Sequence, residues 1–270
     1  MDTATHRDFS ESAAQLYQRF FVPAIATPVS SELLNAAALR AGEAVLDVAC
    51  GTGLISRRSA AAVGANGTVT GIDVSPDMID VAAATDRPAG APIEWHVADA
   101  ESMPLPHQSY DVVLCQMGLM FMENKAAAVA EMHRVLKPDG RVVINTPGRI
   151  QPPFEDMERA ITEHINPELG GFVRAVFSMH DPAALRDLLA EASLSDVETT
   201  EYTAQLDLPA PAEFLWQYIN LTPMAPLVAA ASDTAKAAME AHVVDSWASW
   251  VVDGRVPLHQ PMVLATARRR

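Results

Sequence analysis

Cysteine is scarce in this sequence: Cys50 and Cys115 are the only two among 270 residues. Both stand in apolar, strand-like contexts, and their spacing fits neither a disulfide framework nor a Cys-x-x-Cys motif. We therefore expect a reducing compartment, the cytoplasm. The sequence also lacks an uninterrupted apolar run of about 18 residues and an apolar segment near its start. We accordingly expect neither membrane insertion nor a secretion signal.

Basic residues are also few. The chain has 19 Lys and Arg residues and 34 Asp and Glu residues, which gives a formal net charge of -15. The only basic cluster, "ARRR" at 267–270, is too short to follow a phosphate backbone. We therefore expect no nucleic-acid partner.

Metal-binding motifs are missing as well. The eight histidines form no His-x-x-x-His or His-Glu-x-x-His pattern, and they do not cluster with the cysteines. The sequence therefore predicts no metal site.

What the chain does contain is typical of a globular α/β protein, with 49% apolar and 20% charged residues. Short β-branched or apolar runs alternate with helical stretches, and such alternation predicts a mainly parallel sheet with right-handed crossovers. The expected strands are 44–49, 68–74, 93–99, 110–116 and 141–146, with helices at 54–64, 76–85 and 124–136 between them. The "KPDG" after the last of these helices is expected to end it and to turn the chain into the strand at 141–146.

The regions on both sides of this alternation are more helical. Residues 8–40 show helical spacing interrupted by Pro23 and Pro28, so we expect an N-terminal flap over 1–41, ahead of a main domain at 42–270. Beyond residue 146 we expect a helix at 181–193 with Asp181 as its cap and Pro182 at its first position, a strand at 196–208, a helical stretch at 210–252 and a last strand at 261–267.

Two of these later segments are expected to form a helical lid. They are approximately 147–178 and 209–255, and the second is an insertion between the last two strands. Ligands of such sheets bind at the carboxyl ends of the parallel strands. We therefore expect the lid to cover that edge.

The stretch "VLDVACGTGLISRRSA", residues 45–60, runs from a buried strand through Gly51 and Gly53 into a helix. Such a turn allows a ligand to approach the backbone closely and offers it the positive end of a helix. A dinucleotide fingerprint needs a third glycine where Ser56 stands, and no lysine follows as a phosphate-binding loop requires. The sequence of this turn therefore matches neither the dinucleotide-binding fingerprint nor the phosphate-binding loop.

The pattern Asp-x-Ala-x-Gly-x-Gly, formed by Asp47, Ala49, Gly51 and Gly53, resembles motif I of the class I S-adenosylmethionine-dependent methyltransferases. Ala49 replaces the first glycine of the usual pattern. The resemblance implies that this turn approaches the methionine and ribose portions of the cofactor, with Asp47 near the methionine amino group through water.

Three further stretches extend the resemblance over about residues 42–146. "GIDVSPDMI" is similar to the second motif and implies that Asp73 binds the ribose hydroxyls. "VADAESMPLP" is similar to the third and implies that Asp99 accepts from the adenine amino group while the Ala100 amide donates to the ring. "YDVVLCQMGLMF" and "AEMHRVLKPDGRVVI" resemble the subgroup that includes ubiquinone and menaquinone methyltransferases.

The resemblance implies a Rossmann-like α/β fold whose seven-stranded sheet has an antiparallel last strand. Met78 either flanks adenine or belongs to the core, and Tyr17 either reaches the cofactor or packs elsewhere. The other cofactor contacts that the resemblance implies are Thr52, Val74, Gln116 and Met117.

The acceptor side is less specific. Apolar and aromatic residues near the expected lid favour a small, apolar or aromatic organic acceptor, methylated at oxygen, nitrogen or carbon. We also expect a monomer or a homodimer. The candidate acceptor contacts are Met120, Phe121, Trp216 and Trp247, and His180 is the candidate base. Two alternatives stay open: an NAD-dependent oxidoreductase, whose ribose Asp73 would also suit, and a non-catalytic module that binds S-adenosylmethionine.

Overall fold

The computed structural model describes residues 9–86 and 89–270, so the first eight residues of the expected flap lie outside the described part. The chain divides into two compact units. The helical unit comprises Met1–Pro28, Arg149–Ser178 and Thr203–Gln260. The sheet unit comprises Val29–Gly148, Met179–Tyr202 and Pro261–Arg270.

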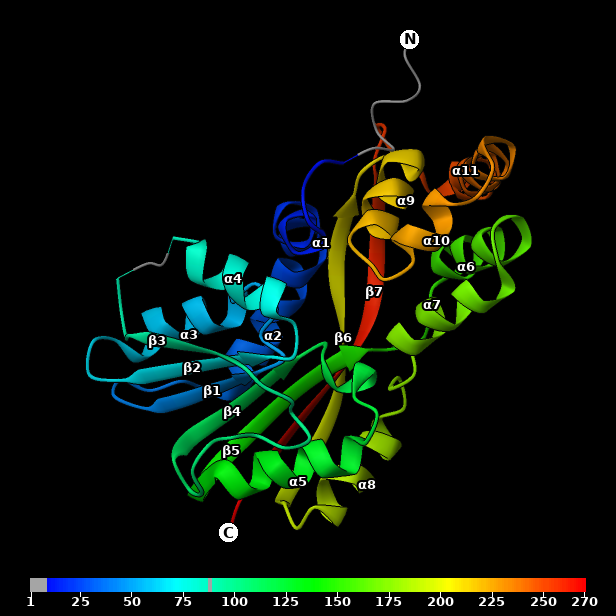
Figure 1. Ribbon diagram of the computed structural model, residues 1–270. Coiled ribbons are helices and arrows are strands. Elements are labelled where there is room, and N and C mark those ends of the chain that lie inside the picture. The colour runs from blue at the N-terminus through cyan, green and yellow to red at the C-terminus, as the bar shows by residue number, and fades with distance from the viewer. Residues whose placement is uncertain (1–8, 87–88) are drawn as a thin grey trace. The chain divides into compact units, whose positions relative to one another are not determined.

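A seven-stranded sheet in the order β3-β2-β1-β4-β5-β7-β6 is the framework (Figure 1). Its first five strands pair in parallel, whereas β7 runs antiparallel to β5, as the resemblance implies. The strands are β1 Ala44–Val48, β2 Thr68–Asp73, β3 Ile93–Val97, β4 Tyr110–Gln116, β5 Leu136–Pro147, β6 Ser195–Leu208 and β7 Val256–Arg268. The predicted α/β architecture and sheet are therefore confirmed.

Register brings the carboxyl ends of the central strands together. Val48 of β1 lies opposite Ile72 of β2, and Asp73 lies opposite Val97 of β3. The strand order reverses at β1: β2 and β3 follow on one side of it, whereas β4 pairs with its other side and β5 lies beyond β4. Such a switch point is where open α/β sheets bind ligands.

The longer helices of the sheet unit arise where the sequence predicts them, and side chains cap three of them. Ser75, Asn124 and Asp181 each accept a hydrogen bond from a backbone N–H in the first turn of the following helix. The helices are α2 Thr27–Ala37, which begins in the helical unit, α3 Leu54–Val63, α4 Pro76–Ala84, η2 Leu119–Phe121, α5 Lys125–Val135 and α8 Pro182–Glu191.

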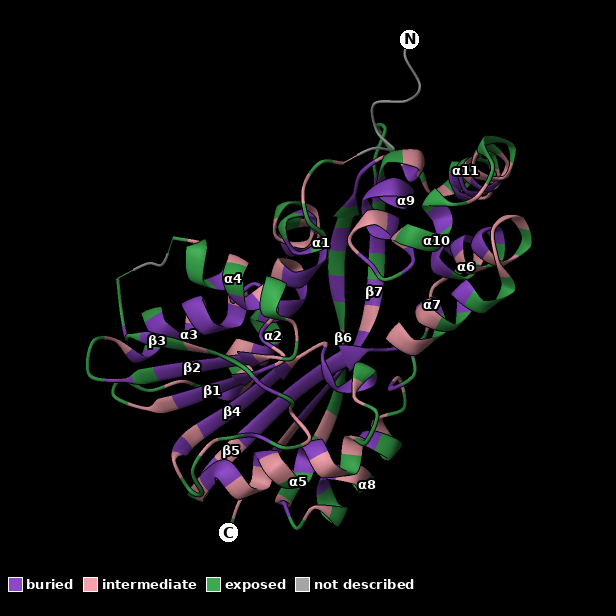
Figure 2. Ribbon diagram, in the orientation of Figure 1, coloured by how far each residue is buried: buried purple, intermediate pink, exposed green. Residues whose placement is uncertain are grey.

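The core of the sheet unit lies between these helices and the strands. Figure 2 shows that β1 and β4 are largely buried, which suits central parallel strands with apolar runs. One cluster joins helical and strand residues, among them Leu33, Ile55, Val45, Leu114 and Val143.

The start of β5 differs from the prediction. We expected "KPDG" to turn the chain ahead of a strand at 141–146, but β5 begins at Leu136, which pairs with Tyr110. The register then shifts before Val112 pairs with Arg141. Asp139 has a φ of 63°, so the proline and glycine form an irregularity inside the strand and not a separate turn.

The prolines near the N-terminus do not interrupt the helix there, which corrects a second expectation. α1 Ala13–Leu16, the π-helix η1 Tyr17–Ala26 and α2 follow one another without a break. Pro23 lies inside η1, where the Thr27 N–H donates to the Val22 carbonyl five residues back. The wider turn changes hydrogen-bond partners by one residue and so accommodates a residue that lacks an N–H.

Aromatic side chains form the core of the helical unit. The ring centroids of Phe214 and Trp247 lie 5.6 Å apart, and those of Phe154 and Trp247 lie 6.3 Å apart. The Trp247 indole N–H donates to the Pro153 carbonyl at 2.8 Å, which connects α11 to α6. The helices of this unit beyond η1 are α6 Pro152–His164, η3 Pro167–Leu169, α7 Gly170–Val176, α9 Pro211–Asn220, α10 Ala225–Ala229, α11 Asp233–Trp247 and η4 Ala248–Trp250.

The helical character of the two expected lid segments is therefore confirmed, and their position over the sheet edge stays a prediction. Within the described ranges, no helix has both the length and the apolar character that crossing a bilayer requires.

Candidate functional site

The turn between β1 and α3 has a backbone that few residues adopt. Ala49, Gly51 and Gly53 have φ values of 55°, 53° and 84°. A side chain on Gly53 would also collide with the indole of Trp95, so glycine is required there for two reasons. Ala49 occupies the position of the motif's first glycine at a strain of about 1–2 kcal/mol. Ala49 and Gly51 are half-buried in this turn, whereas Thr52 and Gly53 are buried.

Asp73 closes this turn from the end of β2. Its Oδ2 accepts a hydrogen bond from the Gly51 N–H at 2.8 Å, and its Oδ1 accepts one from the Ser75 N–H at 2.9 Å. Burial raises the pKa of the carboxyl, although these backbone donors oppose the shift. A carboxylate has about four acceptor positions, so the backbone donors of Gly51, Val74 and Ser75 leave capacity for a ligand hydroxyl. Val74, directly after it, is 71% exposed despite being apolar.

Asp47 lies deeper in the sheet. Its side chain is buried and accepts a hydrogen bond from the Ser56 hydroxyl of α3 at 2.6 Å. Burial raises the pKa of Asp47 to about 7, and the nearby Asp73 charge adds to this effect. The structure therefore shows Asp47 hydrogen-bonded to α3. A water-mediated contact between Asp47 and a ligand remains a prediction.

Asp47 should make stability depend on pH. Its pKa is about 7 in the folded chain against 3.8 for the free group, so the folded state holds the extra proton between these values. The free energy of unfolding should therefore fall by about 1–3 kcal/mol from pH 5 to pH 8. The free energy of unfolding of Asp47→Asn, measured by urea unfolding at several pH values, should lack this fall with pH. Asp80→Asn, on the exposed side of α4, is the control; equal slopes for wild type and Asp47→Asn would contradict the assignment.

Arg57 stabilises the glycine turn, a role that the sequence alone did not predict. Its guanidinium is largely buried and donates from Nη1 to the Thr52 carbonyl at 2.8 Å, which fixes the glycine turn from the first turns of α3. The Thr52 hydroxyl is buried and has no hydrogen-bond partner among the described residues. An arginine next to "GTG" has no distinctive spacing, and only the folded turn shows its role.

The exit of β3 carries Asp99 and Ala100. The Ala98 N–H donates to the Asp73 carbonyl at 2.9 Å, so the exits of β2 and β3 are joined. Asp99 is exposed, and its Oδ1 accepts from the Glu101 N–H at 2.8 Å. The predicted ribose and adenine carboxylates therefore lie on adjacent strand exits.

Gln116 and Met117 lie where β4 ends. Met117 has a φ of 51°, and its N–H donates to the Asn145 carbonyl at 3.0 Å. Gly118, which no sequence motif indicates, approaches the glycine turn so closely that an added Cβ would lie 2.5 Å from the Ala49 Cβ. A small residue is therefore needed at Gly118 to bring this exit against the turn.

Both cysteines are free and buried in this unit. Burial raises the pKa of Cys115 to about 12 and also raises the pKa of Cys50. Both thiols therefore stay protonated near neutral pH, and neither supplies a thiolate nucleophile.

The remaining candidates lie in different surroundings. Met78 is half-buried on α4, Met120 is buried and Phe121 is 52% exposed on η2. His180 is half-buried just before the cap of α8. These four residues belong to the sheet unit, together with the glycine turn and Asp73.

Three candidates belong to the helical unit instead. Tyr17 stacks on Phe21 with ring centroids 4.6 Å apart. Trp216 and Trp247 are buried, and the Trp216 indole N–H donates to Glu240 at 2.6 Å. Their contribution to a ligand site stays a prediction.

Comparison with known proteins identifies the sheet unit's motifs. Residues 45–140 match a family model described as a methyltransferase domain. The chain is 32% identical over 179 residues to the ubiquinone/menaquinone biosynthesis C-methyltransferase UbiE of Ralstonia pickettii, covering 62% of this chain and 74% of that protein. It is 31% identical over 176 residues to UbiE of Neisseria meningitidis serogroup A, covering 61% and 72%.

Solved structures share the fold. The YcgJ protein from Bacillus subtilis superimposes with a TM-score of 0.57 at 16% identity, covering 90% of this chain and 98% of that one. The Haemonchus contortus phosphoethanolamine N-methyltransferase 2, in complex with S-adenosylhomocysteine, gives 0.56 at 17% identity, covering 95% and 56%.

These findings support a methyltransferase over the nicotinamide-dependent alternative. The glycine turn and the remaining acceptor capacity of Asp73 fit a nucleoside with a polar amino-acid portion. The chain belongs to the class I S-adenosylmethionine-dependent methyltransferases and uses S-adenosylmethionine as its methyl donor.

Proposed function

We propose that the enzyme methylates a small organic acceptor with an apolar or aromatic surface. The observation that carries this proposal is Phe121, an aromatic side chain 52% exposed just beyond the exit of β4. Exposed apolar side chains also follow or end the neighbouring strands, at Val74 and Val97. Apolar surface beside a polar cofactor turn is typical of a site for a small, weakly polar molecule.

The cofactor is proposed to lie across the strand exits. Asp73 would bind the ribose hydroxyls, since its carboxylate already receives Gly51 and Ser75 and retains acceptor capacity. Asp99 and the Ala100 amide would bind adenine, with Val74 and Met78 against the ring. The glycine turn and the Thr52 hydroxyl would hold the methionine portion. Gln116, Met117 and Tyr17 are proposed as further contacts.

S-adenosylmethionine supplies an electrophilic methyl group on a sulfonium whose leaving group is neutral. The protein therefore has to align an acceptor atom with that group and exclude water. A hydroxyl or amine acceptor would also lose a proton. We propose His180 as the group that takes it, because it is half-buried in the sheet unit and precedes α8.

A quinone-like ring methylated at carbon is the first acceptor to test. The UbiE relatives are named for C-methylation in ubiquinone and menaquinone biosynthesis, and they match 62% of this chain. Met120 and Phe121 would contact such a ring. The buried Trp216 and Trp247 would act by shaping the helical unit, which we propose as a lid.

Both cysteines are free, which suits a reducing environment, and we propose that the enzyme works in the cytoplasm as a monomer or homodimer.

A coupled assay for S-adenosylhomocysteine release tests the acceptor class. The panel should contain quinols, phenols, amines, thiols and carboxylates, and mass spectrometry should locate the added methyl group. We expect turnover with aromatic acceptors above turnover with charged aliphatic ones. Phe121→Ala should raise the KM for the acceptor more than the KM for S-adenosylmethionine, because Phe121 is proposed to touch only the acceptor. Turnover restricted to charged aliphatic acceptors would contradict the proposal.

A further inference from the structure

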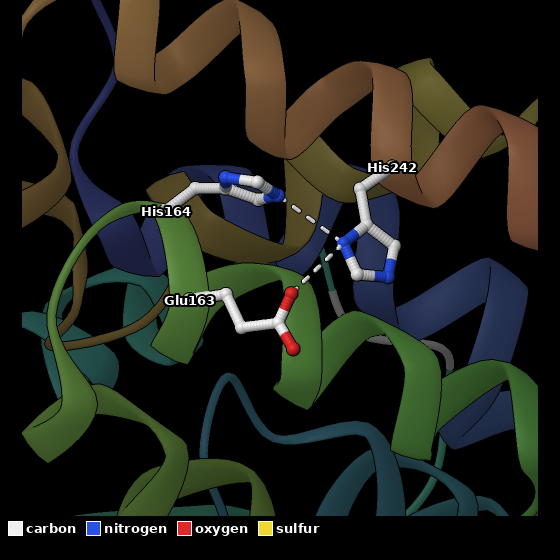
Figure 3. Close-up of side chains that lie close together, drawn as sticks. All are labelled: Glu163, His164 and His242. Atoms are coloured by element: carbon white, nitrogen blue, oxygen red, sulfur yellow. Dashed lines mark hydrogen bonds and ion pairs between the residues drawn. The ribbon is translucent and has the colours of Figure 1, made fainter.

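Three side chains of metal-ligand type meet in the helical unit, on α6 and α11. They are Glu163 and His164 at the end of α6 and His242 on α11, and Figure 3 shows all three directed toward one another. The His164 Nε2 lies 3.2 Å from the His242 Nδ1. A Glu163 carboxylate oxygen lies 3.7 Å from the same Nδ1, and one ligand atom from each residue falls within 4.8 Å of the other two.

The separation of the two histidine nitrogens agrees with that in a zinc site, and the Glu163 oxygen, now 3.7 Å from the His242 Nδ1, would move closer on binding. Zn²⁺ binds histidine nitrogen at about 2.0–2.1 Å, so two nitrogens at adjacent tetrahedral positions lie about 3.3–3.4 Å apart. The 3.2 Å separation between His164 and His242 is close to this value. Two histidines and one carboxylate, with a fourth position left to water or another ligand, form a recognised donor set for this metal.

The cluster holds a hydrogen bond between the two histidine rings and a longer contact from the Glu163 carboxylate. The Nδ1 of His242 faces both the His164 ring and the Glu163 carboxylate. A ring nitrogen carries either one proton or one lone pair in the ring plane, so it can serve only one of these two partners. A cation between the three groups would use a lone pair from each of them at once.

The surroundings favour a bound cation. The pair of helices is already positioned, since the Trp247 indole N–H donates to the Pro153 carbonyl at 2.8 Å. Arg159, one turn before Glu163 on α6, is engaged by Asp156 at 3.0 Å. The His242 side chain is 22% exposed and that of Glu163 is 54% exposed, so an ion can enter from solvent.

We propose that Glu163, His164 and His242 bind a divalent transition metal of the zinc type, which cross-links α6 to α11 within the helical unit. This inference is independent of the acceptor and of methyl transfer. The expectation of no metal site rested on sequence motifs, and 78 residues separate the two histidines.

The test uses the full-length protein without an affinity tag, stripped with EDTA and titrated with ZnCl₂ by calorimetry. We expect one strong site. Because a metal that binds only the folded state stabilises it, free Zn²⁺ at about a hundred times its Kd should raise the midpoint of thermal unfolding by about 5 °C. Co²⁺ should give a visible absorption band typical of tetrahedral coordination in the same site.

His164→Ala and His242→Ala should each abolish strong binding and the Co²⁺ band. Glu163→Gln keeps the side-chain shape at an exposed position and should weaken binding at least about tenfold, since even residues that only support a ligand are worth about 10–100-fold. His259→Ala removes an exposed histidine of the same unit and should bind as wild type does. If wild type binds no Zn²⁺, or if Glu163→Gln and His242→Ala bind as wild type does, the site is refuted.

Discussion

Replacing Asp73 with alanine is expected to weaken S-adenosylmethionine binding by about 1.5–3 kcal/mol, roughly a 10- to 150-fold rise in Kd. The change removes charge-assisted acceptors proposed for the ribose hydroxyls. It also leaves the Gly51 and Ser75 N–H groups without the carboxylate that fixes them beside the cofactor turn. Calorimetric titration with S-adenosylmethionine and with S-adenosylhomocysteine measures the effect, which should be similar for both.

Two variants control this experiment. Asp73→Asn keeps one side-chain oxygen and should lose less affinity than the alanine variant. Asp77→Ala removes an exposed carboxylate from the first turn of α4 and should leave Kd close to the wild-type value. An unchanged Kd for Asp73→Ala would mean that the ribose binds elsewhere.

Replacing Trp247 with alanine is expected to destabilise the helical unit by about 3–5 kcal/mol. Trp247 is fully buried, packs against Phe154 and Phe214, and donates to the Pro153 carbonyl. Its removal leaves a cavity and an unpaired carbonyl in the same place. Hydrogen exchange of the α6 and α11 amides, together with urea unfolding, measures the loss in this unit.

The matched variants separate packing from hydrogen bonding. Trp247→Phe retains an aromatic ring and should cost less, and Trp250→Ala, at the half-buried tryptophan of η4, should cost least. If the helical unit forms the proposed lid, Trp247→Phe should raise the KM for the acceptor more than the KM for S-adenosylmethionine. The opposite order would count against the lid, and equal protection of α6 in Trp247→Ala and wild type would contradict the core assignment.

Local patterns predicted most of the sheet unit because its elements are built from short-range signals. The helix at α8 begins after Asp181 with Pro182 first, as expected, because capping depends on neighbouring residues. The predicted start of β5 was wrong because Leu136 pairs with Tyr110, and a bulge then separates this pair from the rest of the strand. Pro23 was misjudged because a π-helical turn accommodates it.

The candidate site likewise contains residues that the sequence predicted and residues that only the structure shows. Asp73 and the glycine turn were predicted because the family motif keeps them at fixed spacing, and the hydrogen bond between Asp73 and the Gly51 N–H joins them in the structure. Arg57 and Gly118 were missed because their contributions are a contact with a carbonyl and a close approach between turns. Neither feature produces a periodic or compositional signal.

The sequence by itself determined the α/β alternation, the family and the methyl donor, because strand, helix and turn signals and the motif spacing are all local. Only the tertiary structure decided how the strand exits meet, that Asp47 is buried on Ser56 with a raised pKa, and that Glu163 and His164 lie beside His242. Burial and proximity arise from contacts between residues far apart in the chain, where sequence spacing carries no information about distance.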